Sequence, residues 1–388
     1  MINAVVDVSN MFFRSMFIVS GYKNSYTFDS QDELDQLMRK VAMDISSIIR
    51  GLSPSRVVLA FDSRSWRKDI PIDENEGYKA QRTKSTHINW DNFYSIMDEF
   101  SLIAEQKGLI ISKIKGAEAD DLIALWKEKL LKGDQHVIII SGDEDVRQLV
   151  DCTESNGKKY FSAVFNPFTQ GKNSSKRLFV PAGFTEWLED SDPGDIFNRS
   201  VDIDKEDFKR ITTDPKIKTE LINGTQIALR KIFCGDDGDN IPAIYTWIND
   251  NQKEVRITES KFKKIVEELQ IKTPKDLILK SDQIEKLLLE ISNKSFTFKI
   301  KDRLDRQIKL VLLNSEIFPA SITEGFNEQI EKELQKNNIA SQSFNLNFLL
   351  EGTRYISSDI NRYTKTSSSN ESSIFKDIDK ISSNKELF

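Results

Sequence analysis

The chain is organised around residues 116–124, which read Gly116-Ala117-Glu118-Ala119-Asp120-Asp121-Leu122-Ile123-Ala124. Three carboxylates, Glu118, Asp120 and Asp121, lie within four residues, after an apolar run and before a helical pattern. Like charges this close repel, and without a counter-ion some of them would bind protons. Hard oxygen ligands suit Mg²⁺ or Mn²⁺, so the stretch predicts a divalent metal site. The alternative, acids that only favour the first turn of a helix, remains open for this stretch taken alone.

Length and composition set the class of protein. With 388 residues, one or two folded domains are expected. Two cysteines imply no disulfide framework, and the opening MINAVVDVSN resembles no signal peptide. No apolar run reaches the length of a membrane span, so we expect a cytoplasmic protein (host cytoplasm if it is of phage origin). The net charge of −6 argues mildly against nucleic acid, although metal-binding acids inflate that figure.

Short apolar runs rich in Val and Ile predict four buried strands, with helical patterns between them. The predicted strands are Ile2–Val6, Arg56–Phe61, Gly108–Ile114 and His136–Ile140. The predicted helices are Glu33–Arg50, Trp90–Lys107 and Leu122–Lys132. This alternation predicts an α/β fold with a mainly parallel sheet flanked by helices.

Acidic residues follow every one of these strands. They are Asp7, Asp62, the group Glu118, Asp120 and Asp121, and the pair Asp143 and Asp145. In open α/β sheets, ligands bind outside the carboxyl ends of the strands. A single aspartate is more often a turn or N-cap residue, but four strands together favour one shared site.

Residues 63–89 form a connection that is too long and too polar for an ordinary loop. Basic side chains alternate there with Trp66 and Tyr78, which are expected to stack on bases, although Trp66 alternatively packs beneath the loop. The basic residues are Arg64, Arg67, Lys68, Lys79, Arg82 and Lys84. A solvated surface loop is the alternative, but the position above the acidic edge predicts an arch that contacts phosphates.

The second half of the chain begins with a predicted hairpin, Lys159–Phe165 and Lys176–Val180. A predicted helix, Ile222–Cys234, then runs into Gly235-Asp236-Asp237-Gly238-Asp239-Asn240-Ile241-Pro242. The proline suits the first turn of another helix, which predicts a helix–turn–helix. A calcium loop is excluded because Gly238 occupies a ligand position and no suitably spaced glutamate follows. Lys261–Gln270 and Ser281–Ile291 are further predicted helices.

The order and local contexts of these carboxylates resemble the flap endonuclease (5′-nuclease) family of the PIN-like superfamily, closest to its T-even phage members. Tyr78-Lys79-Ala80-Gln81-Arg82 is similar to the arch motif of that family. The other matching stretches are Val5-Val6-Asp7 with Asn10, Ala60-Phe61-Asp62, Glu118-Ala119-Asp120-Asp121, Ser141-Gly142-Asp143-Glu144-Asp145 and Gly235-Asp236 with Asp239-Asn240. The chain departs from the family after Pro242, where Ala243–Trp247 replaces a glycine-rich turn that grips duplex DNA.

The resemblance implies a Mg²⁺-dependent 5′-3′ exonuclease or flap endonuclease with two metal ions, for which Mn²⁺ can substitute, and a role in RNA primer removal during phage-type DNA replication. It implies inner metal ligands at Asp7, Asp62, Glu118, Asp120, Asp143 and Asp145, and outer ones at Asp121, Asp236 and Asp239. Lys79 and Arg82 are expected on the scissile phosphate. Further DNA contacts are expected at Arg64, Arg67, Lys68, Tyr78, Lys84, Gly235, Gly238 and Asn240.

Three regions are expected: a PIN-like core (1–215, with the arch at 63–89 and a hairpin with insert at 155–215), a helical DNA-binding subdomain (216–315), and an extension (316–388) with a flexible tail from about residue 357.

The expected partners are DNA with a free 5′ end or flap and RNA–DNA hybrids. No membrane association is expected, and the protein is expected to be a monomer. Leu387-Phe388 resembles the peptides that dock on sliding clamps, or is merely an apolar end. A single-stranded-DNA-binding protein is a further expected partner.

Three alternatives remain from the sequence. A non-catalytic, structure-specific DNA-binding protein of the same fold would not need carboxylates beside a polyanion. A PIN-type endoribonuclease would be shorter and would lack the arch and the turn that carries Asp236 and Asp239. A Mg²⁺ phosphohydrolase of small molecules would leave the basic arch unexplained.

Overall fold

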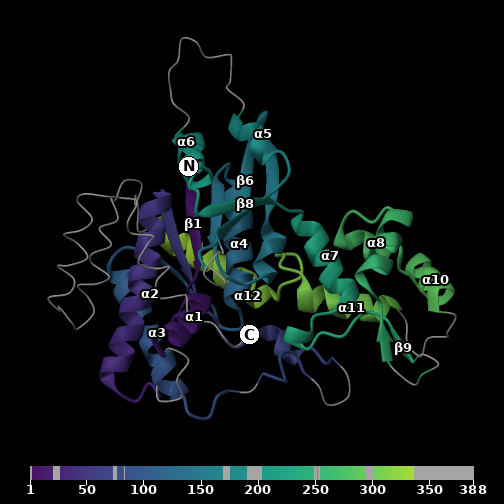
Figure 1. Cartoon of the computed structure of the whole chain (residues 1–388), viewed down its shortest axis with the longest axis horizontal. Helices are drawn as coiled ribbons and strands as arrows, with labels where there is room; N and C mark the ends of the chain where they lie inside the picture. The colour runs from purple at the N-terminus through teal and green to yellow at the C-terminus, as the bar shows by residue number, and fades with distance from the viewer. Residues whose placement is uncertain are drawn as a thin grey trace, which may run out of the picture.

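The structure of the chain, a computed structural model, describes residues 2–20, 27–72, 77–82, 84–168, 175–189, 203–248, 251, 254–292 and 300–335. An eight-stranded sheet runs through its centre in the order β3-β2-β1-β4-β6-β7-β8, with β5 paired to β6 (Figure 1). The strands are β1 (Ile2–Asp7), β2 (Arg56–Ala60), β3 (Ile110–Ser112), β4 (His136–Ile140), β5 (Asp151–Ser155), β6 (Lys158–Asn166), β7 (Lys176–Val180) and β8 (Ile217–Leu221).

Strands β3, β2, β1, β4 and β6 run parallel, whereas β5 and β7 are antiparallel to β6. The predicted α/β fold with a mainly parallel sheet is therefore confirmed. The four predicted strands are present, and their carboxyl ends lie along one edge because neighbouring parallel strands end together. The predicted hairpin is also present, as the antiparallel pair β6 and β7.

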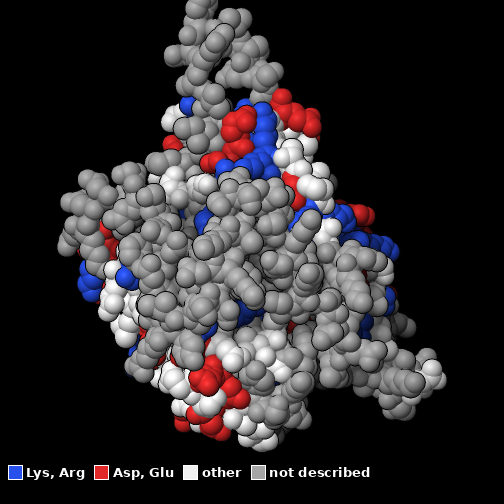
Figure 2. Space-filling view, turned by 60° about the vertical axis from the view of Figure 1, so that its left-hand side comes forward, with Lys and Arg blue, Asp and Glu red and all other residues white. Residues whose placement is uncertain are grey.

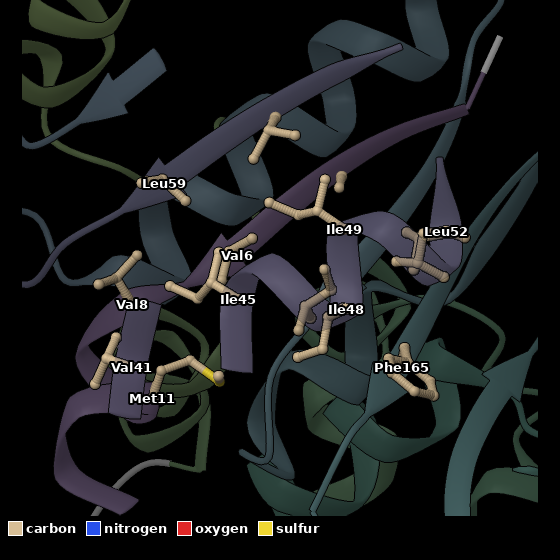
Figure 3. Packing of buried hydrophobic residues seen from close by; sticks show 14 of the residues in the cluster. Val6, Val8, Met11, Val41, Ile45, Ile48, Ile49, Leu52, Leu59 and Phe165 are labelled. Atoms are coloured by element: carbon tan, nitrogen blue, oxygen red, sulfur yellow. The ribbon is translucent and has the colours of Figure 1, made fainter. Parts of the chain in front are cut away.

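Helices cover both faces of the sheet. Successive residues of β1 point to opposite faces, so Ala4 and Val6 enter one core while Val5 enters the other. The first core is covered by α1 (Val8–Ser20), α2 (Gln31–Leu52), α3 (Trp90–Gln106), α5 (Phe184–Glu189) and α6 (Ile203–Thr212). Figure 3 shows Ile45 and Ile49 of α2 packed on Val6 and Leu59 of the sheet. This burial holds the acidic ends of β1 and β2 in fixed positions.

The second core is closed by α4 (Ala119–Lys132) and α12 (Ala320–Gln335), and the sequence patterns did not predict α12. The ring of Phe326 meets that of Trp126 edge to face at 5.3 Å. Gln329 donates to the carbonyl of Ile111 in β3 and accepts from the hydroxyl of Ser112 at 3.0 Å. Helix α12 therefore caps β3, the outermost strand on that side of the sheet.

A third core holds the helical part at the right of Figure 1. It consists of α7 (Gly224–Cys234), α8 (Glu259–Glu268), α9 (Pro274–Leu279), α10 (Ser281–Ser292) and α11 (Ile300–Val311), with a hairpin of β9 (Thr246–Ile248) and β10 (Glu254–Arg256). The helix predicted to start at Pro242 is wrong. Ile241 pairs with Asp236 as an isolated bridge, and the β-branched and aromatic residues that follow form β9 instead.

Within the described ranges, no helix combines the length and apolarity needed to cross a membrane. On the face in Figure 2, basic side chains near the top of the view stand beside acidic ones, and a separate acidic group lies at the bottom. Arg177 and Lys218, for example, both pair with Glu220, at 3.8 and 3.1 Å. The predicted flexible tail, the terminal Leu387-Phe388, and parts of the arch and of the insert lie outside the described residues.

Candidate active site

The carboxyl ends of β1 and β4 are joined through Asp7. One Asp7 oxygen accepts from the backbone of Asn10 at 3.0 Å, and the other accepts from the hydroxyl of Ser141 at 2.8 Å. The same hydroxyl accepts from the backbone of Asp143 at 3.0 Å. Ser141 thus holds the buried Asp7 next to Asp143, which faces solvent.

Helix α4 starts against the end of β2. Asp62 accepts from the backbone of Ala119 at 2.7 Å, and its own N–H donates to Ser9 at 2.9 Å. Glu118 is the N-cap of α4 and forms a capping box with Asp121. The alternative for these acids, helix capping, is therefore real for Glu118 and Asp121. Asp62 and Asp120 also accept backbone N–H groups of the first turn of α4, so capping alone does not separate the four acids.

Arg67 belongs to a short 3₁₀ turn, η1 (Trp66–Asp69), beneath the acidic edge. It is only 1% exposed, and its guanidinium lies 3.3 Å from Glu118 and 2.7 Å from Asp121. Three carboxylates surround this guanidinium (the third, Asp120, lies at 4.0 Å), and the contact of Arg67 with DNA stays a prediction. Burial would raise the pKa of Glu118, yet Lys79 and Arg67 hold it below its ordinary value.

Trp66 packs in the same way. Its ring meets Phe318 at 6.4 Å, and its indole N–H donates to Asp121 at 3.2 Å. Of the two alternatives, stacking on bases and packing beneath the arch, the structure shows packing.

The base of the arch, residues 77–82, is bound to the turn Gly235–Asn240, which contains the 3₁₀ turn η3 (Asp237–Asp239). The backbone N–H of Lys79 donates to Asp239 at 2.9 Å, and the Asn240 side chain donates to Gly77 at 3.0 Å. Lys79 adopts φ 58°, a left-handed conformation that is unfavourable for a non-glycine residue. The turn therefore fixes the direction of Lys79, whose ammonium group lies 2.7 Å from Glu118.

Tyr78 and Arg82 both bind Asp239. The phenol of Tyr78 donates to this carboxylate at 3.0 Å, and Arg82 forms a short ion pair with it. Tyr78 is only 4% exposed, and its stacking on DNA stays a prediction. Burial, followed by the charge of Glu118, raises the pKa of its phenol.

Lys231 is a site residue that the sequence analysis missed. It is 7% exposed, lies 2.6 Å from Asp236, and forms a short ion pair with Asp145 of η2 (Asp145–Leu149). Burial would raise the pKa of Asp236, yet the hydrogen bond and charge of Lys231 keep it below its ordinary value. The sequence of α7 holds a sign of this role: Gly224, Ala228 and Lys231 share one helical face, and a single charge among small residues indicates a buried ion pair.

For the two acids at the strand ends the pKa stays raised, although hydrogen bonds to both, and the charge of Lys79 near Asp62, act against the rise. Burial, followed by the charge of Asp62, raises the pKa of Asp7 to about 7, and Asp143 raises it further. Desolvation raises the pKa of Asp62 and, together with Asp121, that of Asp120. A nearby cation favours the charged form of carboxylates whose pKa is raised in this way, and their hard oxygen atoms fit a divalent one.

The remaining predicted DNA contacts lie on the outside. Lys68 is exposed, Arg64 pairs with Asp69 at 2.7 Å, and Lys84 lies over the ring of Tyr94 at 4.7 Å. The N–H of Gly238 donates to Asp236 at 2.9 Å. Across the described residues, no group of three or more acids, histidines or cysteines has the spacing of a formed metal site, while Lys79, Arg67 and Lys231 lie among the acids.

Gly235 is a testable element of this turn. Its φ of 77° with ψ near 180° is a region that only glycine adopts readily, and an added Cβ would collide with Ile241 and lie 2.7 Å from the nitrogen of Ala243. A residue held in an unfavourable backbone conformation costs about 1–3 kcal/mol. Gly235→Ala should lower the free energy of unfolding by more than this amount, because the collision adds to the backbone strain. Urea denaturation measures this loss. Gly157→Ala is the control, because Gly157 has φ 72° but open space around it; an equal loss in both variants would contradict the collision.

The fold and the site together define a mainly parallel α/β protein with an acidic sheet edge beneath a basic loop. Residues 3–169 match the family model described as 5′-3′ exonuclease, N-terminal resolvase-like domain. This match, over residues 3–169, supports the resemblance to the flap endonuclease (5′-nuclease) family.

Comparison with individual proteins agrees with this family. The chain is 32% identical over 110 residues to flap endonuclease Xni of Photorhabdus laumondii subsp. laumondii, a match that spans 27% of this chain and only 40% of that relative. Two solved structures of phage T5 share the fold at 18% identity and a TM-score of 0.50, covering 88% of this chain and all of theirs. One is the T5 5′-exonuclease with bound zinc, and the other is the T5 flap endonuclease in a complex with DNA and metal ions.

Proposed function

We propose that the chain is a divalent metal-dependent 5′-3′ exonuclease and flap endonuclease that hydrolyses phosphodiester bonds near 5′ ends of DNA or RNA–DNA. The observation that carries the proposal is the acidic sheet edge, where Ser141 holds Asp7 next to Asp143, Asp62 lies against the start of α4, and the charge of Asp62 raises the pKa of Asp7. The family match, the flap endonuclease relative and the T5 complex with DNA and metal ions support it.

Mg²⁺ is the proposed cofactor, with Mn²⁺ as a substitute. Asp7, Asp62, Glu118, Asp120, Asp143 and Asp145 would hold it directly, with Asp121, Asp236 and Asp239 in supporting positions. Two bound ions supply an activated water and stabilise the leaving oxygen in an in-line displacement. Ser141 and Asn10 hold the Asp7 carboxylate in a single orientation for this role.

Lys79 and Arg82 are the proposed phosphate contacts. Lys79 extends from the base of the arch to Glu118 of the acidic edge, whereas Arg82 binds Asp239 and the carbonyl of Gly238 in the neighbouring turn. Cations placed in advance stabilise charge that develops in phosphoryl transfer without reorganisation. The arch above them would admit a single-stranded 5′ end and exclude continuous duplex. Gly235, Gly238 and Asn240 would shape the turn that faces the DNA.

Lys79→Ala should lower cleavage at saturating substrate by about 10²-fold, because a donor fixed by the backbone at Asp239 is lost from the transition state. Single-turnover cleavage of a labelled 5′ flap measures this. Lys113→Ala, which removes an exposed lysine paired with Asp98, is the control and should cleave normally. A change confined to affinity would show that Lys79 only anchors the substrate.

One assay tests the whole proposal: labelled 5′-flap, nicked duplex and RNA-primed substrates, each with and without Mg²⁺. Cleavage of RNA-primed duplex would support a role in primer removal, and binding without cleavage would favour the non-catalytic alternative.

We further propose a division into core (1–215), helical DNA-binding part (216–315) and extension (316–388). We also propose that the protein is a monomer and that its C-terminal end docks on a sliding clamp. A pull-down with and without the last residues tests the docking.

A further inference from the structure

Two lysines occupy equivalent places between the sheet edge and the Gly235–Asn240 turn. Lys231 joins Asp145 of the edge to Asp236 of the turn, the latter at 2.6 Å. Lys79 joins Glu118 of the edge, at 2.7 Å, to Asp239 of the turn, at 3.8 Å. Each ammonium group thus connects one carboxylate of the core with one of the helical part.

Both lysines are poorly accessible to solvent. Lys231 is 7% exposed, and the Lys79 side chain is 17% exposed. A buried charge is stable only when it is paired, so carboxylates brought together without a metal ion need cations from the chain itself. Lys79 and Lys231 supply these cations. The carboxylates that they pair with on the sheet edge, Glu118 and Asp145, are also proposed metal ligands.

From this arrangement, and resting on the proposed metal-dependent function, we propose that Lys79 and Lys231 are stand-in cations that leave their carboxylates when divalent ions bind. Metal affinity is then the result of a competition with the chain's own ammonium groups.

The exchange also links metal to substrate. A lysine released from Glu118 or Asp145 remains next to the edge with an unpaired positive charge, available to a phosphate. Metal ions and DNA should therefore strengthen each other's binding, since coupling between two ligands is reciprocal.

The test measures the affinity of the full chain for Mn²⁺ in the absence of DNA. The electron paramagnetic resonance signal of free Mn²⁺ gives the concentration of unbound ion. Lys231→Met should bind Mn²⁺ about tenfold more tightly than the unsubstituted protein, a typical coupling effect. Lys231→Arg should stay close to the unsubstituted value. Lys127→Met, which removes a half-buried lysine paired with Asp151 outside the site, should leave Mn²⁺ affinity unchanged.

Equal or weaker Mn²⁺ binding by Lys231→Met would overturn the inference and leave the proposed function intact. An unsubstituted protein that binds no Mn²⁺ would overturn both. A second measurement needs no variant: acetylation of Lys231, read by mass spectrometry, should rise about tenfold with Mn²⁺ while that of Lys127 stays constant. An unchanged Lys231 would equally refute the exchange.

Discussion

Asp143→Asn is expected to reduce cleavage by about 10³-fold, the upper end of the loss when one electrostatic group is removed from a transition state. Asp143 is exposed at the end of β4, and the hydroxyl of Ser141 links it to Asp7. Its Oδ1 also accepts from the backbone of Asp145 at 2.9 Å, a bond that an asparagine can keep. The substitution therefore removes a charge and preserves the local geometry.

The measurement is single-turnover cleavage of a 5′ flap at saturating Mg²⁺, with DNA affinity determined separately in Ca²⁺. Affinity should stay within a few-fold of the unsubstituted value, because removing a negative charge does not weaken the attraction to phosphate. Glu144→Gln is the matched control, since Glu144 is the exposed neighbour that pairs with Arg147 at 2.9 Å, outside the acidic group. Unchanged turnover in Asp143→Asn would refute the assignment of Asp143 as a metal ligand.

Arg67→Ala should be the most destabilising single substitution proposed, with a loss of roughly 3–5 kcal/mol in the free energy of unfolding. The guanidinium is buried among Glu118, Asp120 and Asp121, and its removal leaves buried carboxylates without their counter-ion. Thermal or urea denaturation without metal ions measures the effect. Added Mn²⁺ should recover part of the loss, because a ligand that binds only the folded chain stabilises it.

Arg64→Ala tests whether the loss in Arg67→Ala comes from the burial of the guanidinium, because it removes the same charge from an exposed position. Arg64 belongs to the same loop and pairs with Asp69 at 2.7 Å, but both side chains are more than 60% exposed. Exposed pairs of this kind contribute about 0–1 kcal/mol, so the variant should unfold almost as the unsubstituted protein does. Similar losses from Arg64→Ala and Arg67→Ala would contradict the role assigned to the buried guanidinium.

The sheet was predictable from the sequence because its strands are continuous apolar runs that parallel sheets require. The acidic ends of these strands follow from topology, since Asp7, Asp62 and Asp143 each end a strand. Helix α12 was not predicted from the sequence. Its apolar residues Ile322, Phe326 and Ile330 are separated by polar and acidic ones, and they are buried because they pack against α4, which the local sequence does not show.

The charged residues show the limit of such reasoning more clearly. Nothing within the run of residues 63–84 distinguishes the exposed Arg64 from the buried Arg67. The difference comes from Glu118 and Asp121, about fifty positions away, which the fold brings against one guanidinium and not the other. For Lys231, its place on the face of α7 could be seen in the sequence, but its pairing with Asp145 could not, since that aspartate belongs to another region of the chain.

The cap that α12 places on β3 has a consequence for protein preparation. An uncapped outer strand offers its backbone groups to any other strand, and proteins normally block this route to aggregation. Here Gln329 provides the block, more than two hundred residues after the strand that it protects. A shortened chain intended for crystallisation should therefore keep all of α12, because one that stops near residue 315 would expose the edge of β3.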